Sequence, residues 1–169
     1  MKKEISREEI LDRVERRAGD YEELWGNCAQ GTLLALQEEF QLGDKQTLRM
    51  ATAMPGIASR GETCGAVVAA LMVLGLAFGR EEVDDSQAVG ITTARSRKLC
   101  RLFEGEFGSC NCRDVQHRIY GRSFDFYDPA DQAAIGAADM GKKCRLPAGR
   151  AARLAAGIIL SSRDKDHTL

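Results

Sequence analysis

The segment that most constrains the fold is an uncharged stretch of 15 residues from Gly65 to Gly79. It is apolar on every side of a helical projection, and four of its first six residues are Gly or Ala. A span of this length is too short to cross a bilayer, which needs about 20 residues. A helix that is apolar all round and rich in small residues is typical of a protein interior, where its neighbours pack close. We therefore expect a buried central helix over residues 64–78.

The rest of the chain is also divided into helical segments. Ser6 and Glu9 form a capping-box pattern before an amphipathic segment that ends near Gly19, and residues 55–63 are predicted to be a loop. No segment shows the pattern of a strand with any strength. We therefore predict an all-α fold: a single domain over residues 1–169, built as a bundle of about six to eight helices around residues 64–78. The other predicted helices span residues 28–42, 44–54, 86–107, 112–120, 128–140 and 147–162.

The charge and the N-terminal sequence indicate the cellular compartment and exclude some classes of binding partner. The chain carries 24 basic and 25 acidic side chains, a formal net charge of −1, so no overall positive field would attract nucleic acid. The residues from Met1 to Glu4 lead directly into a charged segment, and no signal peptide is recognisable. We therefore expect a cytoplasmic protein that neither binds nucleic acid nor inserts into a membrane. In that reducing compartment, cysteines are more often metal ligands or redox groups than structural disulfides.

The chain contains six cysteines, and their spacing alone identifies no known site. There is no Cys-x-x-Cys pair and no haem-attachment motif, and neither His117 nor His167 lies at zinc-finger spacing. Two histidines without a nucleophile elbow also argue against Ser–His–Asp catalysis. The six are Cys28, Cys64, Cys100, Cys110, Cys112 and Cys144.

Three of the cysteines follow a residue that favours the N-cap position of a helix, so we expect each in the first turn of a helix. Free backbone N–H groups and the helix dipole stabilise a thiolate at that place, and the thiolate is the form that binds metal or attacks disulfides. The three pairs are Asn27–Cys28, Thr63–Cys64 and Asn111–Cys112.

The other three cysteines have different neighbours. Cys144 lies among Lys142, Lys143 and Arg145, whose charges would also favour a thiolate. Cys100 is expected to be a core residue within a helix, and Cys110 is a close companion of Cys112. For any one cysteine, simple burial in the core is the competing interpretation.

Several segments together resemble the C_GCAxxG_C_C family of redox-active proteins, which has four characteristic cysteines and a Cys-Gly-Ala-x-x-Gly motif. The resemblance extends over about residues 20–160, and Ala69 stands where the motif has its last glycine. The matching segments are Asn27-Cys28-Ala29-Gln30, Gly61-Glu62-Thr63-Cys64-Gly65-Ala66, Ala70-Leu71-Met72-Val73-Leu74-Gly75, Phe107-Gly108, Cys112-Arg113-Asp114-Val115 and Lys143-Cys144.

The resemblance implies that Cys28, Cys64, Cys112 and Cys144 are the functional cysteines and leaves Cys100 and Cys110 as extras, of which we take Cys110 as the candidate substitute ligand. These are the four that their neighbours also select. The chain is similar, too, to part of the split-Soret cytochromes, which hold haem and an iron–sulfur centre. Without a haem-attachment motif, only the iron–sulfur part carries over. Our leading hypothesis is that the four cysteines converge on an iron–sulfur cluster, of the [2Fe–2S] type, for electron transfer or redox sensing.

Two alternatives use the same residues. In one, the cysteines work as a thiol/disulfide oxidoreductase without metal, with Cys64 as nucleophile and Cys28 or Cys112 as its resolving partner. In the other, the protein is a structural-zinc or helical interaction module. All three hypotheses leave the redox partner open, and the small residues of the central helix make a helix-packed homodimer a reasonable expectation.

Overall fold

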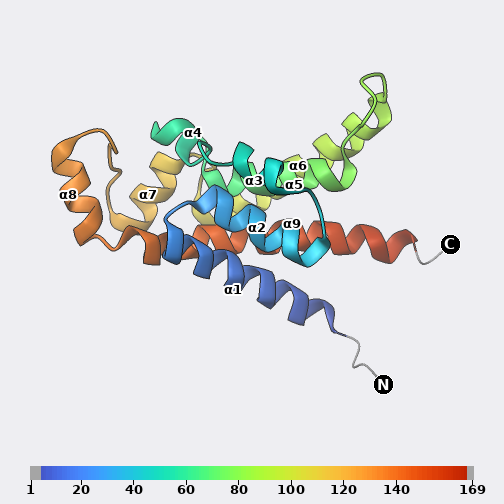
Figure 1. Ribbon diagram of the computed structural model, residues 1–169, viewed down its shortest axis with the longest axis horizontal. Coiled ribbons are helices and arrows are strands. Elements are labelled where there is room, and N and C mark those ends of the chain that lie inside the picture. Colours follow the sequence, from blue (N-terminus) through green and yellow to red (C-terminus); the bar gives the residue numbers. More distant parts are fainter. Residues whose placement is uncertain (1–4, 167–169) are drawn as a thin grey trace.

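The structure is a computed structural model that describes the backbone of residues 5–166 and the side chains of residues 5–162. Within these residues the chain forms nine helices and no strand, which confirms the predicted all-α class. Figure 1 shows the longest helix, α9, running across the middle of the molecule. No helix among the described residues is long and apolar enough to span a membrane. The helices are α1 (Arg7–Trp25), α2 (Cys28–Phe40), α3 (Lys45–Met50), α4 (Gly56–Ser59), α5 (Gly65–Phe78), α6 (Ser86–Phe107), α7 (Cys112–Tyr120), α8 (Pro129–Ala137) and α9 (Met140–Asp166).

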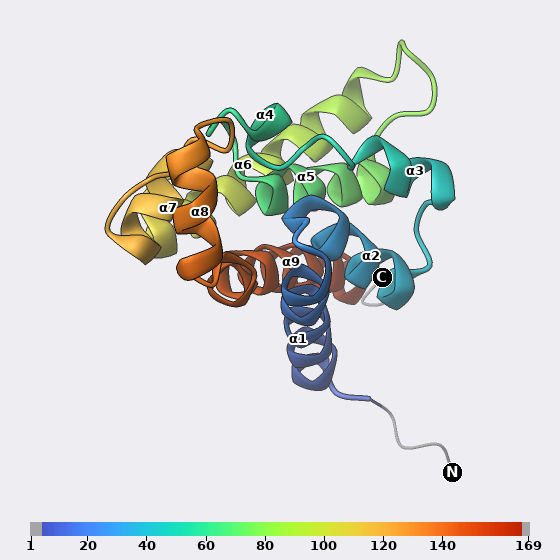
Figure 2. The same cartoon turned by 60° about the vertical axis from the view of Figure 1, so that its left-hand side comes forward.

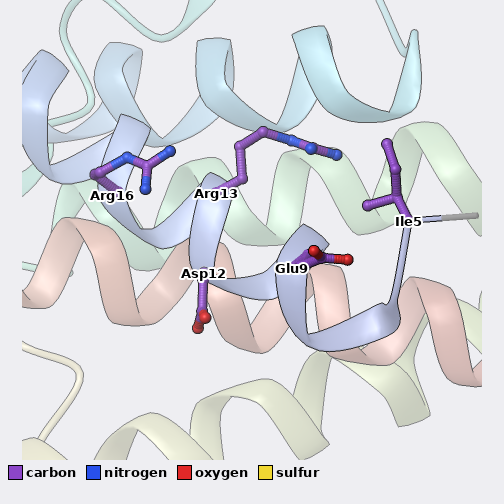
Figure 3. Close-up of a pocket in the computed structure, with 5 residues that line it drawn as sticks. All are labelled: Ile5, Glu9, Asp12, Arg13 and Arg16. Carbon is purple, nitrogen blue, oxygen red and sulfur yellow. The ribbon is translucent and has the colours of Figure 1, made fainter. Parts of the chain in front are cut away.

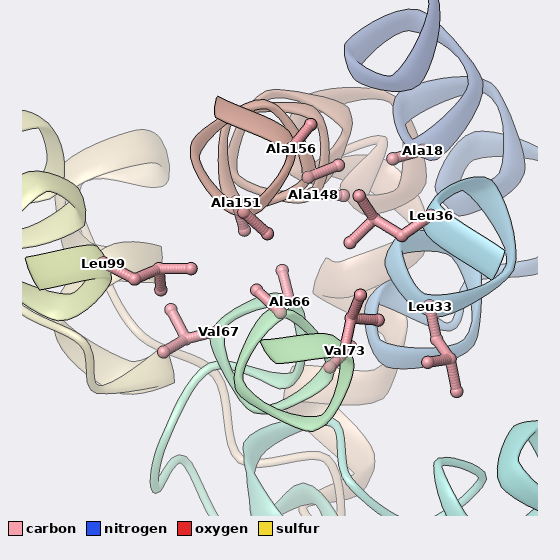
Figure 4. Close-up of a cluster of buried hydrophobic side chains, with 14 of the residues drawn as sticks. Ala18, Leu33, Leu36, Ala66, Val67, Val73, Leu99, Ala148, Ala151 and Ala156 are labelled. Atoms are coloured by element: carbon pink, nitrogen blue, oxygen red, sulfur yellow. The ribbon is translucent and has the colours of Figure 1, made fainter. Parts of the chain in front are cut away.

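Helix α5 is the buried helix that the apolar stretch predicts. It packs against α2, α6 and α9. Its small residues Ala66, Ala69 and Ala70 have no exposed surface, so the neighbouring helices approach its backbone closely. Figure 4 shows Ala66 between α5 and α9, and Val67 pointing toward Leu99 of α6. Dry packing of this kind, at about 25 cal/mol per Å² of buried apolar surface, provides most of the stability of a helical bundle.

Helices α1 and α9 form the most extensive pairing in the molecule and cross each other (Figure 2). A Cβ atom at Gly149 would lie 2.7 Å from the carbonyl oxygen of Glu15, so the two backbones meet at a glycine. Arginines of α9 then pair with acids of α1: Arg153 lies 2.7 Å from Asp12, and Arg150 lies 3.3 Å from Glu15. The two helices run antiparallel, and the pair of Arg145 with Asp20, at 2.6 Å, joins the first turns of α9 to the second half of α1.

The largest differences from the predicted helix boundaries lie in α1 and α9, and α3 also ends at Met50 where we predicted residue 54. The chain continues as a helix through Gly19, because that glycine is buried and its Cα faces the carbonyl oxygen of Arg145, 3.3 Å from where a Cβ would lie. Helix α9 begins at Met140 and contains Pro147, whereas we predicted a start at Pro147. A proline inside a helix costs about 3 kcal/mol. Here that cost is offset because the segment that follows buries a row of alanines, namely Ala148, Ala151, Ala152, Ala155 and Ala156.

The chain just before α5 lies against the chain just before α7. The Cys64 N–H donates to the Cys110 carbonyl oxygen at 2.8 Å, and the Cys112 N–H donates to the Glu62 carbonyl oxygen at 2.6 Å. Between them, Thr63 and Asn111 form an isolated antiparallel bridge. These bonds place the first residues of α5 and α7 side by side, although they are about 50 positions apart in the sequence.

Candidate functional site

The four candidate cysteines are carried by four different helices. Cys28 is the first residue of α2, Cys64 is the N-cap residue of α5, Cys112 is the first residue of α7, and Cys144 lies in the second turn of α9. Figure 1 shows α7 and α8 close to the beginning of α9, on the side of the molecule where α2 and α5 begin. The fold thus brings together residues that the chain separates by up to 116 positions.

A cavity of about 550 Å³ lies at this meeting point, and three of the four cysteines are in its wall. Cys64 is not in the wall, but it is buried and its thiol is hydrogen-bonded to that of Cys28. We call this the four-cysteine cavity. Its lining residues are Glu22, Gly26, Asn27, Cys28, Thr52, Ala53, Pro55, Ala58, Ser59, Cys112, Gln116, Phe126, Tyr127, Ile135, Met140, Gly141 and Cys144.

Each of the four cysteines is close enough to influence at least one of the others electrostatically. Cys64 raises the pKa of Cys28, of Cys112 and of Cys144. The thiols are all free. No group of three or more His, Cys, Asp or Glu side chains within the described part of the chain is arranged to hold a metal ion. The structure therefore gathers the four predicted cysteines in one place as free thiols.

Gly65 explains how Cys28 and Cys64 come so close together. A Cβ atom at residue 65 would lie 2.7 Å from the Cys28 sulfur and 2.8 Å from the Cα of Pro55. Both distances are too short for any side chain. The Cys64–Gly65 dipeptide is thus a packing requirement, since only glycine lets α2 place its first cysteine against the beginning of α5.

Burial, more than helix position, governs the state of these thiols. The pKa of Cys64 is lowered by its hydrogen bond with Cys28 and by the backbone N–H groups of Ala66 and Val67. The hydrogen bond with Cys64 and then burial raise the pKa of Cys28, and burial raises the pKa of Cys112 to about 12. The prediction that all four sites favour a thiolate is therefore wrong for the metal-free protein, and it holds for Cys64 alone.

The predicted N-caps are correct at two of the three positions. Asn27 caps α2 and accepts a hydrogen bond of 3.0 Å from the Gln30 N–H. Asn111 caps α7 by position, but its side chain makes no capping bond. The third cap is Cys64 itself in place of Thr63, because the bridge to Asn111 holds Thr63 in an extended conformation before the helix begins.

The basic residues beside Cys144 do not act on its thiol as predicted. Arg145 pairs with Asp20 at 2.6 Å and with Glu23, both on α1. Lys143 lies over the ring of Tyr120, 5.1 Å from its centroid. Burial therefore dominates and raises the pKa of Cys144 to about 12. The closest polar partner of Cys144 is the hydroxyl of Tyr120, 3.2 Å from the sulfur.

Glu22 is a member of the site that the sequence analysis missed. Its side chain is only 5% exposed, and its Oε2 atom is buried without a hydrogen-bond partner among the described residues. Burial, reinforced by the charge of Cys64, raises its pKa to about 8. A signal was present, because Leu11, Val14 and Ala18 form the buried stripe of α1 and Glu22 is the next position of that stripe. Because the predicted helix ended near Gly19, Glu22 lay outside it and was not assigned to the buried stripe.

A left-handed turn forms part of the cavity wall. The predicted loop over residues 55–63 contains α4, in which φ is 55° at Gly56, 47° at Ile57, 56° at Ala58 and 61° at Ser59. Positive φ is rare for any non-glycine residue, and most of all for a β-branched one. Such conformations persist where the surrounding structure holds them, most often at functional sites. Here the turn carries Ala58 and Ser59 into the wall of the four-cysteine cavity.

The two remaining cysteines lie elsewhere. Cys100 is on α6 and Cys110 is in the segment before α7, and neither lines the four-cysteine cavity. Another depression, of about 380 Å³, lies along the first turns of α1. Figure 3 shows its lining side chains, Ile5, Glu9, Asp12, Arg13 and Arg16, spread along the helix surface. It contains no cysteine and no buried side chain, and so offers none of the chemistry of the four-cysteine cavity.

Comparison with known proteins identifies one family. A family model described as "Putative redox-active protein (C_GCAxxG_C_C)" matches residues 26–158. No curated protein and no solved structure matches the chain.

Proposed function

Because the chain belongs to the redox-active protein family C_GCAxxG_C_C, we propose that its four-cysteine cavity binds an iron–sulfur cluster of the [2Fe–2S] type. The cluster would serve electron transfer or redox sensing. Cys28, Cys64, Cys112 and Cys144 would supply its thiolate ligands. The expected redox partner, homodimer and cytoplasmic location are part of the same proposal.

The observation that carries the proposal is the charge balance of the cavity. Three of the cysteines line it beside Glu22, the fourth, Cys64, is buried next to Cys28, and no residue of the cavity wall is Lys, Arg or His. Several thiolates and a carboxylate would repel one another at such a place, because no basic side chain lines the cavity. Cys28, Cys112 and Cys144 therefore stay protonated in the metal-free protein. A group that carries positively charged metal ions would supply the missing charge and release those protons.

Neighbouring groups of this chain are suited to tune such a cluster. The backbone N–H groups of Ala66 and Val67 lower the pKa of Cys64, the Gln116 amide nitrogen lies 3.3 Å from the Cys112 sulfur, and the Tyr120 hydroxyl lies 3.2 Å from the Cys144 sulfur. When bound, the cluster would accept and release single electrons. Hydrogen bonds to ligand sulfurs favour the more negative, reduced state and raise the reduction potential.

Anaerobic purification tests the proposal. Iron and acid-labile sulfide are measured per chain, together with the visible absorption spectrum. We expect about two irons and two sulfides per chain and strong thiolate-to-iron absorption. A colourless, iron-free protein, both as purified and after incubation with ferrous iron and sulfide, would contradict the proposal. Stoichiometric zinc in place of iron would instead favour a structural-zinc module.

The contact between Cys28 and Cys64 favours a second candidate function, a metal-free dithiol. Their hydrogen bond lowers the pKa of Cys64 and raises that of Cys28, which is the asymmetry of a nucleophile and its resolving partner. In this case the Cys64 thiolate would attack a disulfide, and Cys28 would then displace the product. Free thiols are counted before and after mild oxidation in the metal-free C100S/C110S variant. A loss of two thiols supports this function, and no loss excludes it.

A further inference from the structure

The two cysteines outside the four-cysteine cavity contact each other. The Cys110 thiol donates a hydrogen bond to the Cys100 carbonyl oxygen, with 3.8 Å between sulfur and oxygen, and the two thiols are close enough for each to influence the pKa of the other. Both side chains are half-buried free thiols. We propose that Cys100 and Cys110 form a second redox site, a reversible dithiol that exchanges with anionic low-molecular-weight disulfides of the glutathione class. This site is independent of the proposed function of the four-cysteine cavity.

Solvent access differs between the two thiols. Cys100 lines an open depression of about 400 Å³ between α5 and α6, and Cys110 is not part of its wall. An external disulfide can therefore reach Cys100 from this depression, while Cys110 is held behind it in hydrogen-bonding contact. This arrangement makes Cys100 the attacking residue and Cys110 the resolving residue.

The side chains in the wall of the depression indicate which charge the external disulfide should carry. Arg97 and Arg101 border it, one before and one after Cys100 along α6, and Leu71 of α5 provides an apolar side. One acid, Glu104, is also in the wall. Two guanidinium groups can pair with the carboxylates of a peptide disulfide. A neutral disulfide has no carboxylates to make these pairs. The site thus favours a small anionic disulfide.

The reaction balances as two thiol–disulfide exchanges. The Cys100 thiolate attacks one sulfur of the external disulfide, whose S–S bond breaks and releases one thiol; Cys100 is left in a mixed disulfide. The Cys110 thiolate then attacks the Cys100 sulfur, which forms the Cys100–Cys110 bond and releases the second thiol. The two protein thiols are oxidised by two electrons, the external disulfide is reduced by two, and the protons of Cys100 and Cys110 end on the two released thiols.

The exchange is expected to be slow near neutral pH. Burial raises the pKa of Cys100, the attacking thiol. Little thiolate is therefore present at any moment, and uncatalysed exchange takes minutes to hours. Thiols of high pKa are also poor leaving groups, so the disulfide should be reduced slowly once it has formed.

The second site is connected to the first through the backbone. The Cys110 carbonyl oxygen accepts the Cys64 N–H at 2.8 Å, and Cys112 follows two residues later. A disulfide bond between Cys100 and Cys110 would join α6 to the segment over residues 110–112, which accepts the Cys64 N–H and carries Cys112. Oxidation of the second site would thus restrain the beginning of α7 next to the four-cysteine cavity.

Peptide mapping of the full-length protein tests the proposal. The protein is incubated with oxidised glutathione, the remaining thiols are alkylated under denaturing conditions, and the digest is analysed by mass spectrometry. We expect a peptide pair joined through Cys100 and Cys110, and loss of two titratable thiols. In C110S, Cys100 should stop at the glutathione adduct, because no resolving thiol is present. A Cys110–Cys112 link, or no link at all, would overturn the proposal.

The charge of the substrate is tested with two disulfides. In the R97Q/R101Q variant, we expect the second-order rate with oxidised glutathione to fall at least threefold and the rate with neutral hydroxyethyl disulfide to stay unchanged. Equal changes for both would overturn the assignment of anionic substrates. Iron content distinguishes this proposal from the proposed function, because C100S and C110S should bind as much iron as the wild type whether or not the second dithiol forms.

Discussion

The four-cysteine cavity and the Cys100–Cys110 pair contain the same side chain in two different settings. The cysteines of the cavity come from α2, α5, α7 and α9, and they meet beside a buried carboxylate. Cys100 and Cys110 are ten positions apart, half-buried, and joined by the end of α6 and a short turn. The cavity therefore exists only when the whole bundle is assembled, whereas the pair depends on local structure. Multiple converging thiols suit a metal group, and two accessible thiols suit exchange with a disulfide.

The largest expected effect concerns Glu22, because the four-cysteine cavity contains a buried acid and the Cys100–Cys110 pair does not. Its pKa is raised from 4.5 to about 8 by burial. Because the folded state holds the proton of Glu22 more tightly than the unfolded state does, the free energy of unfolding is highest below the unfolded pKa of 4.5. It then falls as the pH rises to the folded pKa of about 8. Metal-free protein should therefore lose on the order of 5 kcal/mol of unfolding free energy between pH 4.5 and 8. Urea denaturation across this range measures the loss.

The matched variants are E22Q and E82Q. E22Q should remove most of the pH dependence because the amide does not ionise, and E82Q should keep it because Glu82 is exposed. If the stability of E22Q and of the wild type depends on pH in the same way, Glu22 does not have a raised pKa in the folded protein.

A methyl group at Gly65 is the second largest perturbation. In G65A, the new Cβ would overlap the Cys28 sulfur and the Pro55 backbone, at 2.7 and 2.8 Å. Overpacking of this kind costs about 3 kcal/mol. We expect iron loading to fall more than tenfold, because Cys28 is displaced.

G75A is the control within the same helix, since no atom lies within 4 Å of a Cβ at residue 75. Alanine is the better helix former by about 1 kcal/mol, so G75A should be as stable as the wild type or more stable, with full iron loading. Equal iron content in G65A and G75A would refute the packing role of Gly65.

Tyr120 connects α7 to the Cys144 side of the cavity. Its hydroxyl donates to the Met140 carbonyl oxygen at 3.0 Å and lies 3.2 Å from the Cys144 sulfur. Y120F should cost about 1.5 kcal/mol for the lost hydrogen bonds. In the iron-loaded protein Cys144 would be a thiolate, and the Tyr120 hydroxyl would donate to its sulfur; the loss of that bond should also make the reduction potential more negative. Y127F is the control, since Tyr127 also lines the cavity but is 73% exposed. A redox titration that gives equal potentials for both variants would count against Cys144 as a ligand.

The smallest expected effect concerns the caps of the helices that begin with cysteine. N27A should cost about 1 kcal/mol, because Asn27 accepts the Gln30 N–H at 3.0 Å. N111A should cost less, because Asn111 makes no side-chain capping bond. Thermal or urea unfolding of the two variants measures the difference, and a larger loss in N111A would mean that the caps are assigned in the wrong order.

The sequence predicts the fold class and the central helix because both depend on composition and periodicity. The apolar stretch from Gly65 to Phe78 can only be buried, and its small residues predict close neighbours. The helix over residues 140–166 was not predictable in the same way. Pro147 favours a helix start when it is read locally, and only the burial of the alanines that follow it against α1 and α5 outweighs that preference.

For the candidate site, the sequence selects Cys28, Cys64, Cys112 and Cys144, and the fold brings them together. It does not predict the state of their thiols. N-cap residues and neighbouring cations are visible in a sequence, whereas the contact with Cys64 that raises the pKa of Cys28 and the burial that raises the pKa values of Cys112 and Cys144 arise only from packing. Glu22 was missed for the same reason, since an acid near the end of a helix is normally exposed.

The central claim is that four cysteines, and not six, bind one iron–sulfur cluster. It is tested most directly by iron content in six single Cys→Ser variants, each purified anaerobically and reconstituted under the same conditions. We predict that C28S, C64S, C112S and C144S each lose most of their iron and visible absorption, while C100S and C110S retain the wild-type level. Wild-type iron in any of the first four, or a similar loss in all six, would contradict the claim.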